Sequence, residues 1–332
     1  MRPIIPQSNS PVQAETKKIA IYLTNKCNLK CKHCFIEGSP ENTNFLSQEQ
    51  INTALQYFAK NNYSKVEFTG GEACISPFLI DSLLMAKKFN YDTGVSTNGT
   101  NTHLLEQISP SIVDKITFSL DGATAKTNDF LRGKSVFNLC INNIKKAINM
   151  GFYVEAIFTV HKLNYHEISK VIKLLDKIGV KRLSFNFINN RGTAILNQDL
   201  LLPPEKWVAA RKIIEKASVN TKISLRYPIL FVTQKEFVEI KKNTDYFCRL
   251  LEPVKTEIYP NGNIYHCCFV VGIDDITAGK VTDTKVTMNT AKEIAFARKY
   301  AHLSCPVHEV QKLFATESKL IPLCLYYKTI TH

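Results

Sequence analysis

Long apolar runs are absent from this chain of 332 residues. No stretch approaches the ~18 consecutive apolar residues of a membrane-spanning helix. The N-terminal segment MRPIIPQSNSPVQAETKK carries prolines and polar residues where a signal peptide has an apolar core. These absences predict a cytoplasmic protein with no membrane partner.

Acidic residues are scarce beside basic ones, with 29 Asp and Glu against 42 Lys and Arg and a formal net charge of +13. The chain also lacks an Arg-rich run or a basic segment interleaved with aromatics, so no specific nucleic-acid partner is predicted. Two interpretations of the excess charge stay open. It is a Lys-rich surface without a specific role, or it attracts an anionic partner.

Ten cysteines are too few for a disulfide scaffold of this length. In a reducing compartment, clustered thiols more often ligate a metal or take part in catalysis. Three of them, Cys27, Cys31 and Cys34, fall within eight positions with the spacing C-x3-C-x2-C, and Cys74 and Cys140 stand alone. The C-terminal third holds Cys248, Cys267, Cys268, Cys305 and Cys324.

Strand-like and helix-like patterns alternate from residue 18 onward. Amphipathic patterns predict helices between the strands, the first with Ser47 as its N-cap. Six βα repeats favour a parallel sheet, either doubly wound or a partial barrel. The predicted strands lie within 18–24, 65–70, 91–99, 114–122, 153–160 and 181–188, and the predicted helices within 47–61, 77–89, 135–150 and 166–179.

Polar residues gather where the predicted strands end. In parallel α/β folds, the carboxyl ends of the strands form one edge, where ligands bind. The first four strands are therefore expected to bring their end residues to a single site. These residues are the cysteine loop, Gly70, Gly71, Glu72, Ser96, Thr97, Asn98, Ser119 and Asp121.

The repeat ends after residue 190. A helix with proline at its start is predicted over 203–218, and 255–272 reads as a β-hairpin around Pro260, Asn261 and Gly262. We place a boundary near residue 195. The predicted organisation is a tail (1–17), a βα-repeat domain (18–194) and a small α+β C-terminal extension (195–332).

Three thiolates are one fewer than structural zinc or an ordinary iron–sulfur cluster takes. A [4Fe–4S] cluster on three cysteines leaves one iron open to a substrate or cofactor. Zinc is the competing interpretation. It would more naturally use a fourth Cys or His, and His33 is poorly placed for this because it lies between two of the cysteines.

C-x3-C-x2-C after the first strand of a βα-repeat domain resembles the radical S-adenosylmethionine (SAM) superfamily. This resemblance implies a partial (β/α)6 TIM-like barrel, a [4Fe–4S] cluster and SAM. It also implies reductive cleavage of SAM to a 5′-deoxyadenosyl radical that abstracts a substrate hydrogen, and an electron donor such as flavodoxin or ferredoxin.

Further motifs carry the resemblance across residues 18 to 190. FTGGEA resembles the GGE motif that contacts the SAM amino group, although Ala73 replaces the usual proline. STNG, SLDG and DFLRGKSVFN resemble segments that line the SAM ribose and carboxylate, and His33 fits an aromatic position near the adenine. The resemblance implies that the cofactor contacts are His33, Gly70, Gly71, Glu72, Ser96, Asn98, Ser119 and Arg132. For the two serines and Asn98, local turn hydrogen bonding is the alternative.

The late cysteines resemble the first half of the SPASM/twitch pattern, which carries an auxiliary cluster. Cys248, Gly262 and Cys267 match it, but a later C-x2-C-x5-C-x3-C is missing. The count fits one auxiliary [4Fe–4S] cluster, with Cys248, Cys267, Cys324 and, less firmly, Cys305 as ligands. Since neighbouring residues of a strand face opposite ways, either Cys267 or Cys268 should point away from it. The alternative is that these thiols are packed in a small core.

Cys74 follows the GGE motif by two residues. A thiol there would serve as the hydrogen-atom donor that epimerases of the superfamily require. The competing interpretation is packing at the start of the next helix, and Cys140, inside a helical pattern, is expected in the core.

Three functions are compatible with these motifs, and no residue identifies the substrate. The first is maturation of a ribosomally made peptide by epimerisation or cross-linking, for which the basic surface would suit an acidic leader. Against it, the ~17 residues before the first strand are fewer than a leader-binding domain needs. The second is a small-molecule dehydrogenase or epimerase. The third is a non-catalytic iron–sulfur or zinc-binding scaffold.

Overall fold

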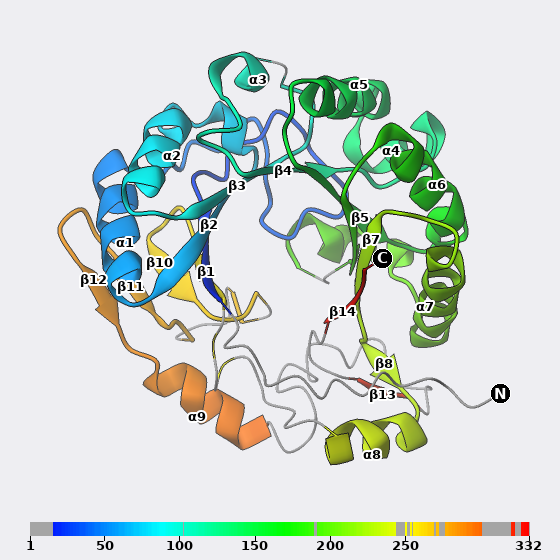
Figure 1. The fold of residues 1–332 in the computed structure, drawn as a ribbon. Helices are drawn as coiled ribbons and strands as arrows, with labels where there is room; N and C mark the ends of the chain where they lie inside the picture. Colours follow the sequence, from blue (N-terminus) through cyan, green and yellow to red (C-terminus); the bar gives the residue numbers. More distant parts are fainter. Residues whose placement is uncertain are drawn as a thin grey trace.

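The computed structural model describes residues 16–101, 103–188, 191–243, 250, 253, 255–268, 270–271, 276–300, 320–322 and 327–331. Seven parallel strands form a curved sheet, with helices on its outer side (Figure 1). The strands are β1 (Lys17–Tyr22), β2 (Tyr63–Thr69), β3 (Asp92–Thr97), β4 (Lys115–Ser119), β5 (Val154–Val160), β6 (Arg182–Phe187) and β7 (Ser224–Pro228). The α/β partial-barrel fold predicted from the sequence is confirmed.

The helices follow the strands in the predicted alternation. The helices are α1 (Gln48–Lys60), α2 (Leu79–Lys88), α3 (Leu104–Gln107), α4 (Ala125–Arg132), α5 (Val136–Asn149), α6 (Ile168–Ile178), α7 (Pro204–Ser218), α8 (Gln234–Asn243) and α9 (Ala291–Tyr300), with 3-10 turns η1 (Ala73–Ile75), η2 (Tyr165–Glu167) and η3 (Gly192–Leu200). Ser47 caps α1 in a capping box with Gln50, and Pro204 opens α7, as the sequence predicts. In the described residues, no helix has the length and apolarity to cross a membrane.

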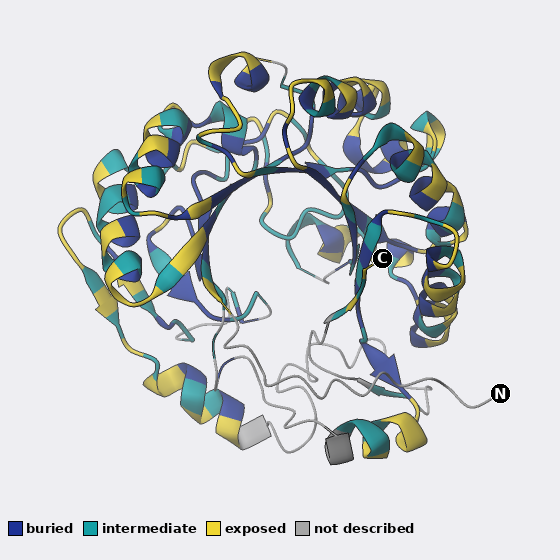
Figure 2. Cartoon of the chain, viewed as in Figure 1, coloured by how far each residue is buried: buried dark blue, intermediate teal, exposed yellow. Residues whose placement is uncertain are grey.

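The main core lies between the sheet and the helices. Outward-facing strand residues such as Ile19, Ile21 and Phe68 are fully buried there, and the helices expose their far faces (Figure 2). Many of the inward-facing residues that alternate with them are polar or charged, as Lys65 and Glu67 on β2 show, although Ala20 and Tyr22 on β1 belong to a second, smaller apolar cluster. The strands therefore have the alternating pattern of a sheet with one polar face, rather than the continuous apolar pattern of strands buried on both faces.

The sheet extends beyond the six strands expected from the sequence. On one side β7 is parallel to β6, and β14 (Tyr327–Ile330) is antiparallel to β7. On the other side β9 (Lys255–Ile258) is parallel to β1, and the antiparallel strands β10 (Asn263–Tyr265), β11 (Gly279–Val281) and β12 (Val286–Met288) follow it. A separate two-stranded sheet pairs β8 (Phe231–Val232) with β13 (Ile321–Pro322).

The sequence did not reveal β7, because its outward residues Leu225 and Tyr227 alternate with the inward-facing Arg226 and no long apolar run results. The expected hairpin is present: β9 and β10 are antiparallel, and Gly262 between them has φ +81°, a conformation that glycine adopts without strain. Strands from both sides of residue 195 belong to one sheet. The domain boundary predicted near this residue remains a prediction.

Candidate functional site: a cysteine loop at the carboxyl ends of the strands

The loop after β1 carries Cys27, Cys31 and Cys34, and its base is hydrogen-bonded to the GGE segment after β2. The Gly71 N–H donates to the carbonyl of Thr24 at 2.7 Å, and the Glu72 N–H donates to that of Lys26 at 3.0 Å. A Cβ on Gly71 would lie 2.4 Å from the Lys26 carbonyl oxygen. Glycine is therefore required where the two backbones meet, which is a packing reason for this part of the motif.

The three thiols lie in surroundings that suit cluster ligands. The Leu29 N–H donates to Cys27 Sγ at 3.4 Å, and the Gly38 N–H donates to Cys34 Sγ at 3.2 Å. Hydrogen bonds to the sulfurs are one of the means by which proteins tune iron–sulfur clusters. Burial raises the pKa of Cys27 to about 11 and that of Cys31 to about 12. The positive charge of bound iron would offset this, because thiolates are the ligating form.

A zinc site would gather its ligands around a single point. In the part of the chain that the structure describes, no three His, Cys, Asp or Glu side chains are grouped as ligands of one metal ion. A four-iron cluster instead spreads its cysteines over separate irons. Glycine at position 38 keeps the space beside the thiols free of a side chain. A Cβ there would lie 3.3 Å from Cys27 Cβ and 3.5 Å from Cys34 Sγ. The three thiols on one loop are the donor set of a [4Fe–4S] cluster with one open iron.

The carboxylate of Glu72 is almost fully buried and is engaged within the protein. Its Oε1 accepts from the Thr97 hydroxyl at 2.8 Å and from the Cys74 N–H at 3.1 Å, and its Oε2 accepts from the Asn98 N–H at 2.7 Å. Glu72 thus joins the ends of β2 and β3. Its side chain has a structural task besides the SAM contact that the resemblance implies.

The residues predicted to contact the SAM ribose and carboxylate lie in different surroundings in the structure. Asn98 lies against the cysteine loop, donating to Asn28 Oδ1 at 2.9 Å and to Cys27 Sγ at 3.7 Å. Ser96 faces the inside of the barrel and donates to Glu67 Oε1 at 2.7 Å. The carbonyl of Ser119 accepts from the Cys140 thiol at 3.6 Å, and Cys140 is fully buried in α5, as expected.

Asp121, which the sequence placed at the strand ends without a role, proves to organise one side of the site. Its Oδ2 accepts from Arg132 Nε at 2.5 Å and lies 3.1 Å from His33 Nε2, while its Oδ1 accepts from the Thr159 N–H at 2.6 Å. Burial alone would raise the pKa of Asp121. The charges of Arg132 and His33 outweigh burial and hold this pKa well below its usual range. Arg132 also lies near enough to Cys31 to favour its thiolate.

The Asp121 cluster holds the cysteine loop from the side of α4. The Lys32 N–H donates to the carbonyl of Leu131 at 3.0 Å, and Asn197 Nδ2 donates to the carbonyl of Lys32, also at 3.0 Å. His33 Nδ1 is buried and makes no hydrogen bond to the described residues. His33 and Arg132 thus lie beside the cysteine loop, and the roles given to them by resemblance remain predictions.

Cys74 lies on the side of β3 that faces the helices. Its Sγ is 3.5 Å from the Thr97 hydroxyl, and Thr97 alternates with the inward-facing Ser96. Burial, followed by the charge of Glu72, raises the pKa of the thiol well above its usual range. This contact fits the packing interpretation, and the hydrogen-donor role stays a prediction.

Two of the five late cysteines are described, on the turn after β10. Cys267 and Cys268 pack against the smaller apolar cluster, which contains Tyr22 on β1 and Tyr259 just after β9. Cys267 and Cys268 both lie near Arg191, on the loop after β6. Cys248, Cys305 and Cys324 lie outside the described residues, so the auxiliary ligand set remains a prediction.

The family model for the radical SAM superfamily matches residues 21–175. The chain carries a radical SAM superfamily domain. The matched segment spans β1 to α6 and contains the cysteine loop, the GGE segment and Asp121. For this segment the family implies a [4Fe–4S] cluster and SAM as cofactors.

Known proteins of two kinds are similar to it. The Bacillus subtilis antilisterial bacteriocin subtilosin biosynthesis protein AlbA is 30% identical over 200 residues, which cover 58% of this chain and 43% of AlbA. A probable GTP 3′,8-cyclase of Saccharolobus islandicus is 26% identical over 282 residues, 80% of this chain and 88% of the cyclase. The chain thus matches less than half of the length of AlbA.

Solved structures share the fold. Streptococcus suis SuiB bound to S-adenosylmethionine superposes with a TM-score of 0.63 at 18% identity, over 79% of this chain and 62% of SuiB. The SAM-bound anSMEcpe superposes with a TM-score of 0.60 at 17% identity, over 86% of this chain and 82% of that one. At these identities, the likeness supports the architecture.

Proposed function

We propose that this radical SAM enzyme modifies a ribosomally made peptide, by epimerisation or cross-linking. The observation that carries the proposal is the 30% identity to AlbA over 200 residues, since AlbA is a biosynthesis protein of the bacteriocin subtilosin. The net charge of +13 suits an acidic peptide segment. The basic surface would then serve association with that segment.

The residues of the site divide the work. When bound, the cluster and SAM supply the one-electron chemistry that generates a hydrogen-abstracting radical. Cys27, Cys31 and Cys34 hold the cluster, and the glycines of the GGE segment fix the backbone of their loop. Asp121 holds His33 and Arg132 beside it. The wall of parallel strands surrounds the substrate and limits access of water.

The alternative is a small-molecule enzyme, a dehydrogenase or epimerase of the twitch-bearing type. One observation favours small-molecule chemistry: the match to a GTP 3′,8-cyclase covers 80% of this chain, more than the match to AlbA does. The non-catalytic scaffold is a third candidate, which release of 5′-deoxyadenosine would exclude.

The deciding experiment offers reduced, reconstituted enzyme with SAM either a precursor peptide encoded beside its gene or GTP. Cross-linking predicts the loss of two hydrogens from the peptide, and epimerisation in deuterated water predicts the gain of one solvent deuterium. Either reaction predicts transfer of deuterium from labelled peptide into 5′-deoxyadenosine, with GTP unaltered. Dithionite replaces the flavodoxin or ferredoxin that we propose as the electron donor. Consumption of GTP with an unaltered peptide would overturn the peptide assignment.

Iron content tests the proposed auxiliary cluster. Two four-iron clusters should give about eight irons per chain after anaerobic reconstitution. The variant with Cys27, Cys31 and Cys34 all changed to Ala should keep about four, because the late cysteines are intact. Iron and sulfide analysis with Mössbauer spectroscopy measures this. Saturation of the unmodified protein at four irons would show that the late cysteines are structural.

A further inference from the structure

Three lysines lie side by side on the inner face of the sheet. In the register of neighbouring strands, Lys18 on β1 is paired with Lys65 on β2 and with Lys255 on β9. In-register residues of neighbouring parallel strands point to the same face. The next residue of β1, Ile19, is fully buried in the outer core, so Lys18 faces the lumen. Like charges placed directly opposite each other on a sheet repel.

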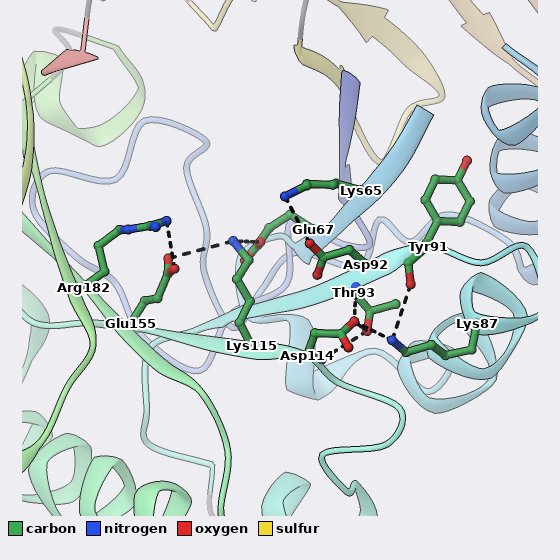
Figure 3. Close-up of polar contacts among 10 residues, drawn as sticks. All are labelled: Lys65, Glu67, Lys87, Tyr91, Asp92, Thr93, Asp114, Lys115, Glu155 and Arg182. Carbon is green, nitrogen blue, oxygen red and sulfur yellow. Dashed lines mark hydrogen bonds and ion pairs between the residues drawn. The ribbon is translucent and has the colours of Figure 1, made fainter. Parts of the chain in front are cut away.

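The carboxylates of this inner face already have cationic partners. Lys65 pairs with Asp92 at 3.2 Å, and Lys255 pairs with Glu257. Glu67 pairs with Lys115 at 2.9 Å, and Glu155 pairs with Arg182 at 3.0 Å (Figure 3). Among the described residues, no carboxylate lies within ion-pair distance of Lys18.

The surroundings of Lys18 are electrostatically positive. Burial, together with the charges of Lys255, Arg226 and Lys115, lowers its pKa to about 7, and the charge of Glu67 opposes this shift. These neighbours come from β9, β7, β4 and β2, which lie on different sides of the lumen. An anion at this position would therefore interact favourably with several strands at once.

The inward-facing cations at this level, which stand at the first residues of β4, β6 and β9, are partly open to solvent. The inward-facing side chains of Lys115, Arg182 and Lys255 keep exposed fractions of 33%, 36% and 40%. A tightly packed barrel interior, filled by layers of branched apolar residues, would leave such side chains no exposure. A small anion can therefore reach these ammonium and guanidinium groups.

We propose that Lys18 is the centre of an anion-binding site in the barrel lumen, which holds a carboxylate of the substrate. This inference rests on the proposed peptide substrate. Lys18 precedes the end of β1 at Tyr22 by four residues, or ~13 Å at the usual rise of a strand. An Asp or Glu about four residues from the modified position would span that depth in an extended peptide.

Calorimetric titration of the reconstituted full-length enzyme with glutarate, a dicarboxylate, tests the site without the peptide. Lys18→Met should bind glutarate at least about tenfold more weakly, the loss expected for one charge-assisted contact. Lys18→Arg keeps the charge and should stay within about threefold. Lys17→Met is the matched control, since it removes the neighbouring lysine on the exposed side of the same strand, and it should bind as the unmodified protein does.

Lys18→Met should fold at least as well as the unmodified protein, because it removes a charge without a counter-charge, and circular dichroism checks this. Equal glutarate binding by Lys18→Met and the unmodified enzyme would overturn the site. Pyrophosphate binding much tighter than glutarate, and lost in Lys18→Met, would overturn the carboxylate assignment in favour of a phosphate-bearing substrate. Because no peptide enters the titration, failure of the peptide proposal alone would leave the glutarate result unchanged.

Discussion

Changing Cys27, Cys31 and Cys34 together to Ala should abolish release of 5′-deoxyadenosine from SAM. The three thiolates are the ligands that the loop supplies to the cluster. Without them the protein does not hold the cluster, including the iron with the open coordination position. The backbone hydrogen bonds from the loop to the GGE segment do not involve the thiols and should persist. Anaerobic incubation with dithionite and SAM, followed by chromatography, measures the product.

Cys140→Ala is the matched control for this variant. Cys140 is also a buried thiol, but it packs in α5 away from the loop, so the variant should still release 5′-deoxyadenosine. Undiminished release by the triple variant would refute the assignment of the cysteine loop as the SAM-cleaving centre.

Asp121→Ala should lower the free energy of unfolding by about 3–5 kcal/mol, the range for breaking a buried ion pair by removing one partner. Arg132 would be left as a buried charge without its carboxylate, and the Thr159 N–H would lose its acceptor. Urea unfolding followed by circular dichroism measures the change. The double change of Asp121→Ala with Arg132→Leu should recover part of the loss, since both charges are then absent.

A surface ion pair provides the comparison. Glu41→Ala removes the carboxylate partner of Lys30, but both side chains are more than 60% exposed, so stability should not change measurably. An equally small effect of Asp121→Ala would show that the buried cluster does not hold α4 to the cysteine loop.

The dependence of stability on pH in acid tests the same buried ion pair. Because the folded-state pKa of Asp121 is depressed, its stabilisation is fully present above its unfolded-state pKa of about 4 and is lost as pH falls through the folded value. The stability difference between the unmodified protein and Asp121→Asn should therefore shrink below about pH 4. A difference that stays constant with pH would contradict the assigned pKa direction.

The sequence predicted the elements that carry local signals. Ser47 with Gln50 marks the start of α1, Pro204 marks α7, and Gly262 marks the hairpin, because each acts through its own backbone or its nearest neighbours. The cysteine spacing and the GGE segment are equally local. Residues 18–24 were predicted to form a buried strand, and this was correct for Ile19 and Ile21 but not for Lys18, which faces the lumen.

By itself, then, the sequence determined the βα order and the position of the cysteine loop, since periodicity and motif spacing are properties of neighbouring residues. The pattern left a doubly wound sheet and a partial barrel open, and the family resemblance implied the barrel. Tertiary structure alone decided the rest. The pairing of Asp121 with Arg132 and His33, the placement of Cys74 against Thr97, and the row of Lys255, Lys18 and Lys65 depend on which strands become neighbours. Strand order and register join residues far apart in the chain, and no local pattern encodes that choice.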